Sequence, residues 1–305
     1  MPIDILQLVP LRPEIQVKLA ERYRLHGKDD LDRVAGIVRG VVTNGHMGPD
    51  PQLLDRLTGV EIISSASVGY DGIAVEYARA KGIPVTNTPD VLNDDVADLA
   101  IALMVMTARR LVASDRFVRE GKWAPGNEYP LATKVSGKRL GILGLGRIGK
   151  AIARRAEAMD MSIAYNTRRA VEGAPYQHYA DLAALAANSD FLIVIIPSTP
   201  QTKAIVNRKV IEALGPQGIL INVARGAVVD EDALVEALKT GTLGGAGLDV
   251  FAREPQVPPA LLTMDNVVLE PHVGSATIET RRAMSQLVLD NLDAHFAGRP
   301  LLTPV

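Results

Sequence analysis

The sequence predicts an α/β protein that is built on parallel sheets. Short apolar runs alternate with amphipathic helical patterns along most of the 305 residues, which is the order that strand–helix–strand units produce. The run Phe191–Ile196 is apolar throughout, as a strand in a sheet with helices on both faces needs to be. A glycine-rich turn around Gly146 separates another apolar run from an amphipathic helix.

Composition and charge exclude several classes of protein. Hydrophobic residues make up 47% and charged residues 22%, as in ordinary globular proteins, and the length favours two domains. A formal net charge of −2 does not favour binding to nucleic acid or to an anionic membrane. The absence of cysteine excludes disulfides, thiolate catalysis and cysteine metal sites, and it fits a reducing, cytoplasmic location. No metal site is predicted. The apolar segment Ala97–Ala108 contains Asp98 and is too short to span a bilayer.

The N-terminal part is expected to form a small parallel α/β domain. Its predicted strands are Ile3–Val9, Ala35–Thr43, Val60–Ser64 and Ile83–Asn87. The helices between them are Pro13–Tyr23, Pro51–Leu57 with Asp50 as its cap, and one that ends at Lys81 before Gly82.

The chain then changes to one long helix, from Asp94 through Arg109 and beyond, and to an arm that contains Trp123. A second α/β series follows, with strands at Leu140–Leu143, Ser162–Asn166, Phe191–Ile196, Ile219–Val223, Ala246–Val250 and Val267–Leu269. The last helix, Ser275–Phe296, has no strand after it and is expected to complete the first domain. The predicted bounds are 1–97 plus 274–305 for a discontinuous substrate domain, and 98–273 for a dinucleotide-binding domain. Both domains are expected to be Rossmann-like or flavodoxin-like.

The glycine-rich turn carries the pattern Gly-x-Gly-x-x-Gly between a strand and a helix, which is the context that dinucleotide binding requires. Gly144 allows the tight turn, Gly146 lets the backbone approach a pyrophosphate, and Gly149 lets helix and strand pack closely. The anion would lie on free N–H groups at the helix N-terminus. The expected cofactor contacts here are Gly144, Leu145, Gly146, Arg147, Ile148 and Gly149.

The end of the second strand of this series distinguishes the two nicotinamide cofactors. An acidic residue there binds the ribose 2′-hydroxyl of NAD, but the sequence reads Tyr165-Asn-Thr-Arg-Arg and has no Asp or Glu. Two arginines and a hydroxyl can bind a 2′-phosphate by charge and by forked hydrogen bonds. NADP(H) is therefore predicted over NAD(H), which stays possible, with contacts from Asn166, Thr167, Arg168 and Arg169. An ordinary solvated basic turn is the alternative.

Three charged residues follow predicted strand ends. Arg225 suits a keto-acid carboxylate because its guanidinium is forked and always charged. His272 can transfer a proton near neutral pH, and a carboxylate such as Glu254 on the other ring nitrogen would fix the imidazole and favour its charged form. Taken singly, each of the three could be an ordinary loop residue. The other histidines, His26, His178 and His295, are interpreted as structural, and His46 is left open.

Four segments, in this order and spacing, resemble the D-isomer-specific 2-hydroxyacid dehydrogenases: LGLGRIG, INVARGAVVDEDAL, GLDVFAREP and LEPHVGS. The resemblance covers almost the whole chain, including SVGYDGI in its N-terminal part. Within the family, the YNTRR turn is similar to that of the NADPH-using glyoxylate/hydroxypyruvate reductases.

The resemblance implies a D-2-hydroxy acid/2-keto acid pair, closure of the domains on binding, and a homodimer formed through the Asp98 helix and the Trp123 arm. It implies that His272 is the acid/base, Glu254 its partner and Arg225 the substrate clamp. Further contacts to the cofactor would come from Pro197, Thr202, Val223, Ala224, Arg225, Asp249, His272 and Gly274. The substrate would contact Val68, Gly69, Arg225 and His272.

The implied reaction is reduction of glyoxylate or hydroxypyruvate with NADPH. Two alternatives remain open. One is a reductase of bulkier keto acids such as hydroxyphenylpyruvate, with Gly45, His46, Met47 and Tyr70 as pocket residues of unknown placement. The other is a corepressor that resembles this family and uses the dinucleotide as a sensor.

Overall fold

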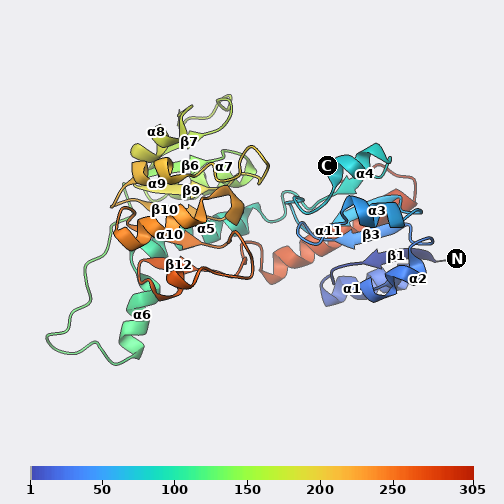
Figure 1. The fold of residues 1–305 in the computed structure, drawn as a ribbon, viewed down its shortest axis with the longest axis horizontal. Coiled ribbons are helices and arrows are strands. Elements are labelled where there is room, and N and C mark those ends of the chain that lie inside the picture. Colours follow the sequence, from blue (N-terminus) through green and yellow to red (C-terminus); the bar gives the residue numbers. More distant parts are fainter. Residues whose placement is uncertain (1) are drawn as a thin grey trace. The chain divides into compact units, whose positions relative to one another are not determined.

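The computed structural model describes residues 2–305 and divides them into two compact units. The first unit contains residues 2–92 and Ser275–Val305, and the second contains Asn93–Gly274 (Figure 1). The assignment of one unit to substrate and the other to cofactor, with the bounds given above, stays a prediction.

The first unit is a five-stranded parallel sheet in the order β2-β1-β3-β4-β5. Its strands are β1 (Ile3–Gln7), β2 (Tyr23–His26), β3 (Gly40–Thr43), β4 (Ile62–Ser65) and β5 (Val85–Thr86). Its helices are α1 (Pro13–Arg22), α2 (Leu31–Val34), α3 (Pro51–Arg56), α4 (Val75–Ala80) and α11 (Ile278–Phe296), and a 3-10 turn η1 spans Lys28–Asp30. Strand β2 was not expected, because Tyr23 was taken as the end of a helix and only four residues form this edge strand.

Alternate strand residues of the first unit face opposite layers of helices, as the two-residue period of a strand requires. Leu6, Val41 and Ile63 pack with α2, α3 and α4 on one face. Their neighbours along the strands pack with α1 and α11 on the other face. These neighbours are Ile5, Val42 and Ile62. The last helix therefore packs against the first sheet, as expected, and supplies Val288, Leu289 and Leu292 to its core.

The second unit is a seven-stranded parallel sheet in the order β12-β11-β10-β9-β6-β7-β8. Its strands are β6 (Arg139–Leu143), β7 (Ser162–Asn166), β8 (Gln177–His178), β9 (Phe191–Val194), β10 (Ile219–Asn222), β11 (Gly245–Leu248) and β12 (Val267–Leu269). Its helices are α5 (Asn93–Ala108), α6 (Leu111–Arg119), α7 (Arg147–Glu157), α8 (Leu182–Ala187), α9 (Arg208–Leu214) and α10 (Glu231–Thr240), with 3-10 turns η2 (Gly226–Val228) and η3 (Pro259–Thr263). The two-residue strand β8 was not expected.

Helices cover both faces of this sheet, which confirms the expectation from its apolar strands. The core on one face contains residues of α8, α9 and α10. On strand β11, Gly247 lies against Leu103 and Thr107 of α5, where an added Cβ would be about 3 Å from either side chain. Helix α7 lies beside α5, and Arg155 forms ion pairs with Asp94 at 3.0 Å and with Asp98 at 2.5 Å.

The prediction of a single long helix from Asp94 onward was wrong, because the helix is interrupted between Ala108 and Leu111. Arg110 has a left-handed backbone with φ of 52°, and a separate helix, α6, begins after it. The N–H of Thr133 donates to the carbonyl of Ala108 at 2.9 Å, so the arm caps the end of α5. No glycine or proline marks this position, and the contact that ends the helix comes from a residue far along the chain. No helix within residues 2–305 is long and apolar enough to cross a membrane.

Candidate active site

The glycine-rich turn has the geometry that a dinucleotide needs. Gly144 takes φ of 107°, which favours glycine, and a Cβ on Gly149 would overlap the carbonyl oxygen of Gly144. Gly146 is the N-cap of α7 and has no side chain to cap it, and the space that a Cβ would occupy there is open. The turn follows β6 beside β9, where the strand order reverses and such sheets bind their ligands. The N–H groups at the start of this 11-residue helix therefore fit a pyrophosphate.

The turn after β7 presents two cations. Arg168 and Arg169 are exposed, and neither guanidinium forms a hydrogen bond or an ion pair within residues 2–305. The hydroxyl of Thr167 donates to the carbonyl of Arg169 at 2.6 Å, which closes the turn on itself. Since no carboxylate neutralises the arginines, the turn fits a phosphate better than a ribose hydroxyl.

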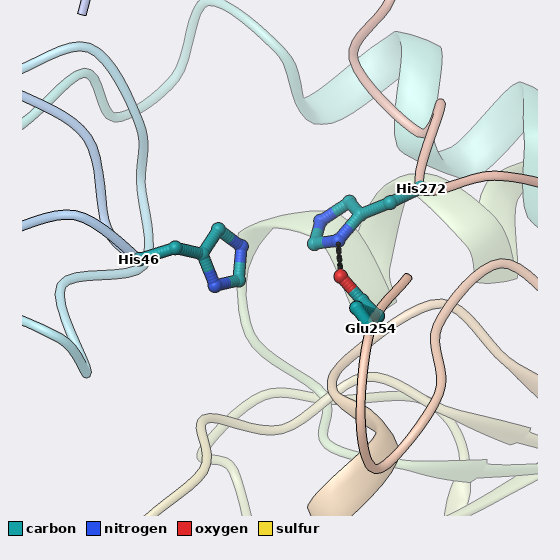
Figure 2. A group of neighbouring side chains, drawn as sticks. All are labelled: His46, Glu254 and His272. Carbon is teal, nitrogen blue, oxygen red and sulfur yellow. Dashed lines mark hydrogen bonds and ion pairs between the residues drawn. The ribbon is translucent and has the colours of Figure 1, made fainter. Parts of the chain in front are cut away.

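An imidazole and a carboxylate lie together after β11 and β12. Nδ1 of His272 and Oε2 of Glu254 are 2.7 Å apart, and Figure 2 shows this contact between the ring and the carboxylate. The other carboxylate oxygen of Glu254 accepts the N–H of Phe251 at 3.0 Å. Because the acceptor is a carboxylate, Nδ1 carries a hydrogen and Nε2 is left to exchange a proton. About a third of each side chain is exposed, 32% for His272 and 28% for Glu254.

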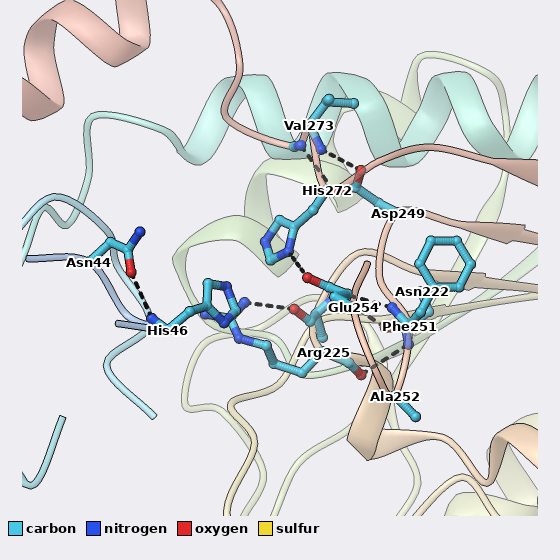
Figure 3. Close-up of polar contacts among 12 residues, drawn as sticks. Asn44, His46, Asn222, Arg225, Asp249, Phe251, Ala252, Glu254, His272 and Val273 are labelled. Atoms are coloured by element: carbon cyan, nitrogen blue, oxygen red, sulfur yellow. Dashed lines mark hydrogen bonds and ion pairs between the residues drawn. The ribbon is translucent and has the colours of Figure 1, made fainter. Parts of the chain in front are cut away.

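Asp249 fixes the backbone of the loop that carries His272. Its two carboxylate oxygens accept the N–H groups of Val273 at 2.7 Å and Gly274 at 2.9 Å (Figure 3). The N–H of His272 donates to the carbonyl of Asp249 at 2.9 Å, and His272 itself takes φ of 56°. Burial raises the pKa of the Asp249 carboxyl, against the effect of the two N–H donors. Carboxylate oxygens have further acceptor sites, so a bound amide remains compatible with these bonds.

Arg225 follows β10, and its loop is braced from both sides. Nδ2 of Asn222 donates to the carbonyl of Arg225 at 3.0 Å, and Oδ1 of Asn222 accepts the N–H of Ala224 at 3.1 Å. A Cβ on Gly226 would overlap the backbone of Phe251, so only glycine lets the loops after β10 and β11 approach so closely. Since β10, β11 and β12 are neighbours in the sheet, their loops bring Arg225, Glu254 and His272 into one group (Figure 3).

The remaining predicted cofactor residues of the second unit lie in loops after β9 and β10. Val223 and Ala224 are buried at the end of β10. The hydroxyl of Thr202 donates to the carbonyl of Pro197 at 2.8 Å and accepts the N–H of Thr199 at 2.8 Å. Thr202 therefore braces its own loop, and the contacts of these residues to a cofactor stay a prediction.

In the first unit, the predicted substrate residues Val68 and Gly69 lie in a loop after β4. The carbonyl of Val68 accepts Nδ2 of Asn87 and that of Gly69 accepts the hydroxyl of Ser67, both at 2.9 Å. Within residues 2–305, the N–H groups of Val68 and Gly69 make no hydrogen bond. The loop thus fixes its carbonyls and leaves two donors available for an anion.

The candidate pocket residues that the sequence could not place lie near this loop in the first unit. The N–H of Gly45 donates to Oγ of Ser67 at 2.6 Å, and Asn44 accepts the N–H groups of His46 and Met47 at 3.0 and 2.8 Å. Met47 is 48% exposed and Tyr70 is 41% exposed.

Sequence reasoning missed the residues that brace the site. Asn222 was included in a strand, although an amide at the end of an otherwise apolar run was an available signal. Glu231 accepts the N–H of Ala252 at 2.9 Å and so fixes the loop that carries Glu254, a contact that no local pattern indicates.

Comparison with known proteins identifies the family. Residues 101–274 match the family model described as D-isomer specific 2-hydroxyacid dehydrogenase, NAD binding domain. The chain is 51% identical to a hydroxyphenylpyruvate reductase of Plectranthus scutellarioides and 50% identical to a glyoxylate/hydroxypyruvate reductase of Arabidopsis thaliana, with 99% of each chain covered in both cases. It also resembles the crystal structure of an NADPH-dependent glyoxylate/hydroxypyruvate reductase from Sinorhizobium meliloti in complex with NADP and malonate. That comparison has a TM-score of 0.94 and 44% identity, and it covers 100% of this chain and 97% of the other.

These matches extend over the glycine turn and over the loops that carry Arg225, Glu254 and His272. The relatives are named as reductases, and their sequences match this chain over the fold and the predicted motifs. The chain is therefore an enzyme, and the corepressor alternative from the sequence analysis is dropped. The chain belongs to the D-isomer-specific 2-hydroxyacid dehydrogenases, as an NAD(P)-dependent oxidoreductase of the glyoxylate/hydroxypyruvate reductase type.

Proposed function

We propose that this enzyme reduces glyoxylate to glycolate and hydroxypyruvate to D-glycerate, with NADPH preferred over NADH. The observation that carries the proposal is the 2.7 Å contact between Nδ1 of His272 and Glu254, next to Arg225. A proton donor, a group that fixes it and a cation for a carboxylate are what the reduction of a 2-keto acid requires of the protein.

The cofactor is proposed to bind on the second unit. The N–H groups at the start of α7 would hold its pyrophosphate, and Arg168 and Arg169 its 2′-phosphate. When bound, the reduced nicotinamide supplies the hydride. The preference for NADPH is supported by two exposed arginines that no carboxylate of residues 2–305 neutralises. The Sinorhizobium meliloti relative, 44% identical, is NADPH-dependent.

The chain's own residues are proposed to handle the proton and the carboxylate. His272 would donate from Nε2 to the keto oxygen as negative charge develops there, while Glu254 holds the ring and stabilises its positive charge. Arg225 would bind the substrate through its guanidinium. The free N–H groups of Val68 and Gly69 are proposed as donors to the substrate carboxylate.

A substrate panel tests the proposal. Consumption of NADPH and of NADH is followed at the nicotinamide absorbance with glyoxylate, hydroxypyruvate and hydroxyphenylpyruvate. The proposal expects the highest kcat/KM with NADPH and one of the two small keto acids. A clear preference for NADH would reject the cofactor assignment, and a preference for hydroxyphenylpyruvate would reject the substrate assignment.

Hydroxyphenylpyruvate is the second candidate substrate, because a relative with 51% identity over 99% of the chain carries that activity in its name. The three acids share a keto carboxylate, so the same His272, Glu254 and Arg225 would serve each of them. Only the pocket for the rest of the molecule would differ.

We also propose a homodimer that forms through the Asp98 helix α5, its continuation α6 after the break at Arg110, and the arm that contains Trp123. Five large apolar side chains of this segment are exposed, which favours a protein partner over solvent, and a second copy is the partner that the family implies. They are Leu111, Val112, Val118, Trp123 and Leu131. A cytoplasmic location stays a prediction from the absence of cysteine.

A further inference from the structure

The two arginines proposed to bind the 2′-phosphate lie in a turn that is anchored at both ends. We call residues 167–171, between β7 and β8, the selectivity turn. Arg168 and Arg169 are exposed in its middle. Ordering an exposed loop on binding would cost conformational entropy, so a turn that is already fixed binds its ligand more tightly.

His178 anchors the start of the selectivity turn. Its Nε2 lies 3.0 Å from the carbonyl oxygen of Thr167. A carbonyl can only accept, so Nε2 carries the hydrogen and donates it. The imidazole also packs against the ring of Tyr165, with centroids 5.1 Å apart, because His178 of β8 is in register with Tyr165 of β7.

Tyr165 anchors the end of the same turn. Its hydroxyl accepts the N–H of Val171 at 2.9 Å, and the residue is only 2% exposed. Nδ2 of Asn166 donates to the carbonyl of Tyr179 at 2.7 Å, which ties the end of β7 to the residue after β8. The buried ring of Tyr165 has little freedom to move, and the partly buried His178 packs against it, so both anchors rest on the core of the second unit.

We propose that His178 and Tyr165 are positioning residues for cofactor selectivity, which hold the selectivity turn in the form that presents Arg168 and Arg169 to the 2′-phosphate of the adenosine. The inference rests on the proposed use of NADPH. It gives a role to β8 and to a histidine that the sequence alone presents as structural. Neither residue would touch the nicotinamide, so the rate of hydride transfer should be insensitive to both.

A matched pair of variants at His178 tests this role. His178→Phe keeps a ring beside Tyr165 and removes the donor, whereas the amide of His178→Gln can still donate to Thr167. Dissociation constants for adenosine 2′,5′-bisphosphate and adenosine 5′-monophosphate are measured by titration calorimetry. We expect His178→Phe to weaken binding of the bisphosphate by about 3- to 10-fold, the value of one hydrogen bond. Binding of the monophosphate should change less than about 2-fold, and His178→Gln should stay close to wild type.

Steady-state kinetics supply the second measurement. His178→Phe is expected to raise KM for NADPH by about the same factor and to leave kcat and KM for NADH unchanged. Equal weakening of both adenosine ligands, or no change in either, would overturn the positioning role. If His178→Phe does not fold, Tyr165→Phe removes the other anchor and keeps the buried ring, and the same outcomes decide.

The double variant Arg168→Ala/Arg169→Ala separates this inference from the proposed function. If it still prefers the bisphosphate as wild type does, the proposed phosphate site is wrong and the positioning role is lost with it. If it loses the preference while His178→Phe and Tyr165→Phe keep it, only the positioning role is wrong.

Discussion

Replacing Glu254 by glutamine tests the proposed proton donor with a small change of shape. The glutamine oxygen can still accept the N–H of Phe251, which Glu254 accepts at 3.0 Å. Its amide nitrogen then faces Nδ1 of His272, where the carboxylate oxygen lies at 2.7 Å. A protonated imidazole would meet a second donor in place of an anion, so the charged form that gives up the proton loses its partner.

The size of the effect follows from the bond that is lost. A hydrogen bond to a charged group contributes about 1.5–3 kcal/mol. At about 1.4 kcal/mol for each factor of ten, kcat/KM for keto-acid reduction should fall about 10- to 150-fold. The assay is the initial rate of NADPH consumption with glyoxylate or hydroxypyruvate at saturating cofactor. His272→Ala, which removes the donor itself, should lose at least about 100-fold in turnover.

Glu231→Gln is the matched control, because Glu231 lies beside the same loop and accepts the N–H of Ala252 at 2.9 Å. Like Glu254→Gln, this variant removes a carboxylate charge and preserves a hydrogen-bond acceptor. Unlike Glu254, however, Glu231 is not hydrogen-bonded to the imidazole of His272. Its activity should stay within about 3-fold of wild type. Near-normal turnover in Glu254→Gln, or an equal loss in the control, would refute the argument.

Three further predictions concern packing, pH and assembly. Gly226→Ala should lower the free energy of unfolding by about 1–3 kcal/mol and raise KM for the keto acid, because the new Cβ overlaps the neighbouring loop, whereas Gly36→Ala, with open space around it, should do neither; equal thermal stability of the two variants would contradict this. The hydrogen bond from Arg139 lowers the pKa of Asp190, so this carboxylate stabilises the fold above the unfolded value of about 3.9 and the stabilisation is lost as the pH falls through the lower folded value. Asp190→Asn should therefore cost about 1 kcal/mol in denaturant unfolding at pH 7 and progressively less below about pH 4, and a cost independent of pH would argue against the ion pair. Leu131 is 97% exposed, and Leu131→Glu should shift the mass measured by light scattering from dimer toward monomer; a wild-type monomer would reject the dimer itself.

Periodicity and glycine patterns sufficed to predict the strands of both sheets except the edge strands β2 and β8. They did so because each buried strand is a short apolar run with a turn signal after it, as in Phe191–Val194. The pairing of Glu254 with His272 was also predicted, but from the order of motifs and not from geometry. The structure adds the 2.7 Å distance and the atoms that form the contact.

What the sequence did not predict depends on contacts between distant segments. The break at Arg110 occurs where Thr133 caps α5, and strand β8 exists because two residues pair with the end of β7. His178 was interpreted as structural since nothing near it in the chain shows that its ring reaches Thr167. Local propensity does not encode such contacts, which arise only once the sheet has formed.

The proposed chemistry is positioned by the sheet, because the hydrogen-bond ladder continues past the strand ends. The N–H of Asp249 donates to the carbonyl of Asn222 at 3.0 Å, and the N–H of His272 donates to the carbonyl of Asp249 at 2.9 Å. The backbone before Arg225, at the base of Glu254's loop and at His272 is thereby linked across three neighbouring strands. Strand register is fixed where both faces of a sheet are buried. The rigid core therefore also fixes the backbone positions from which Arg225, Glu254 and His272 extend. The side chains on this ladder can differ in their contacts to substrate without disturbing it, so we expect the relatives named for hydroxyphenylpyruvate and for glyoxylate and hydroxypyruvate, which are 51% and 50% identical to this chain, to keep the same ladder.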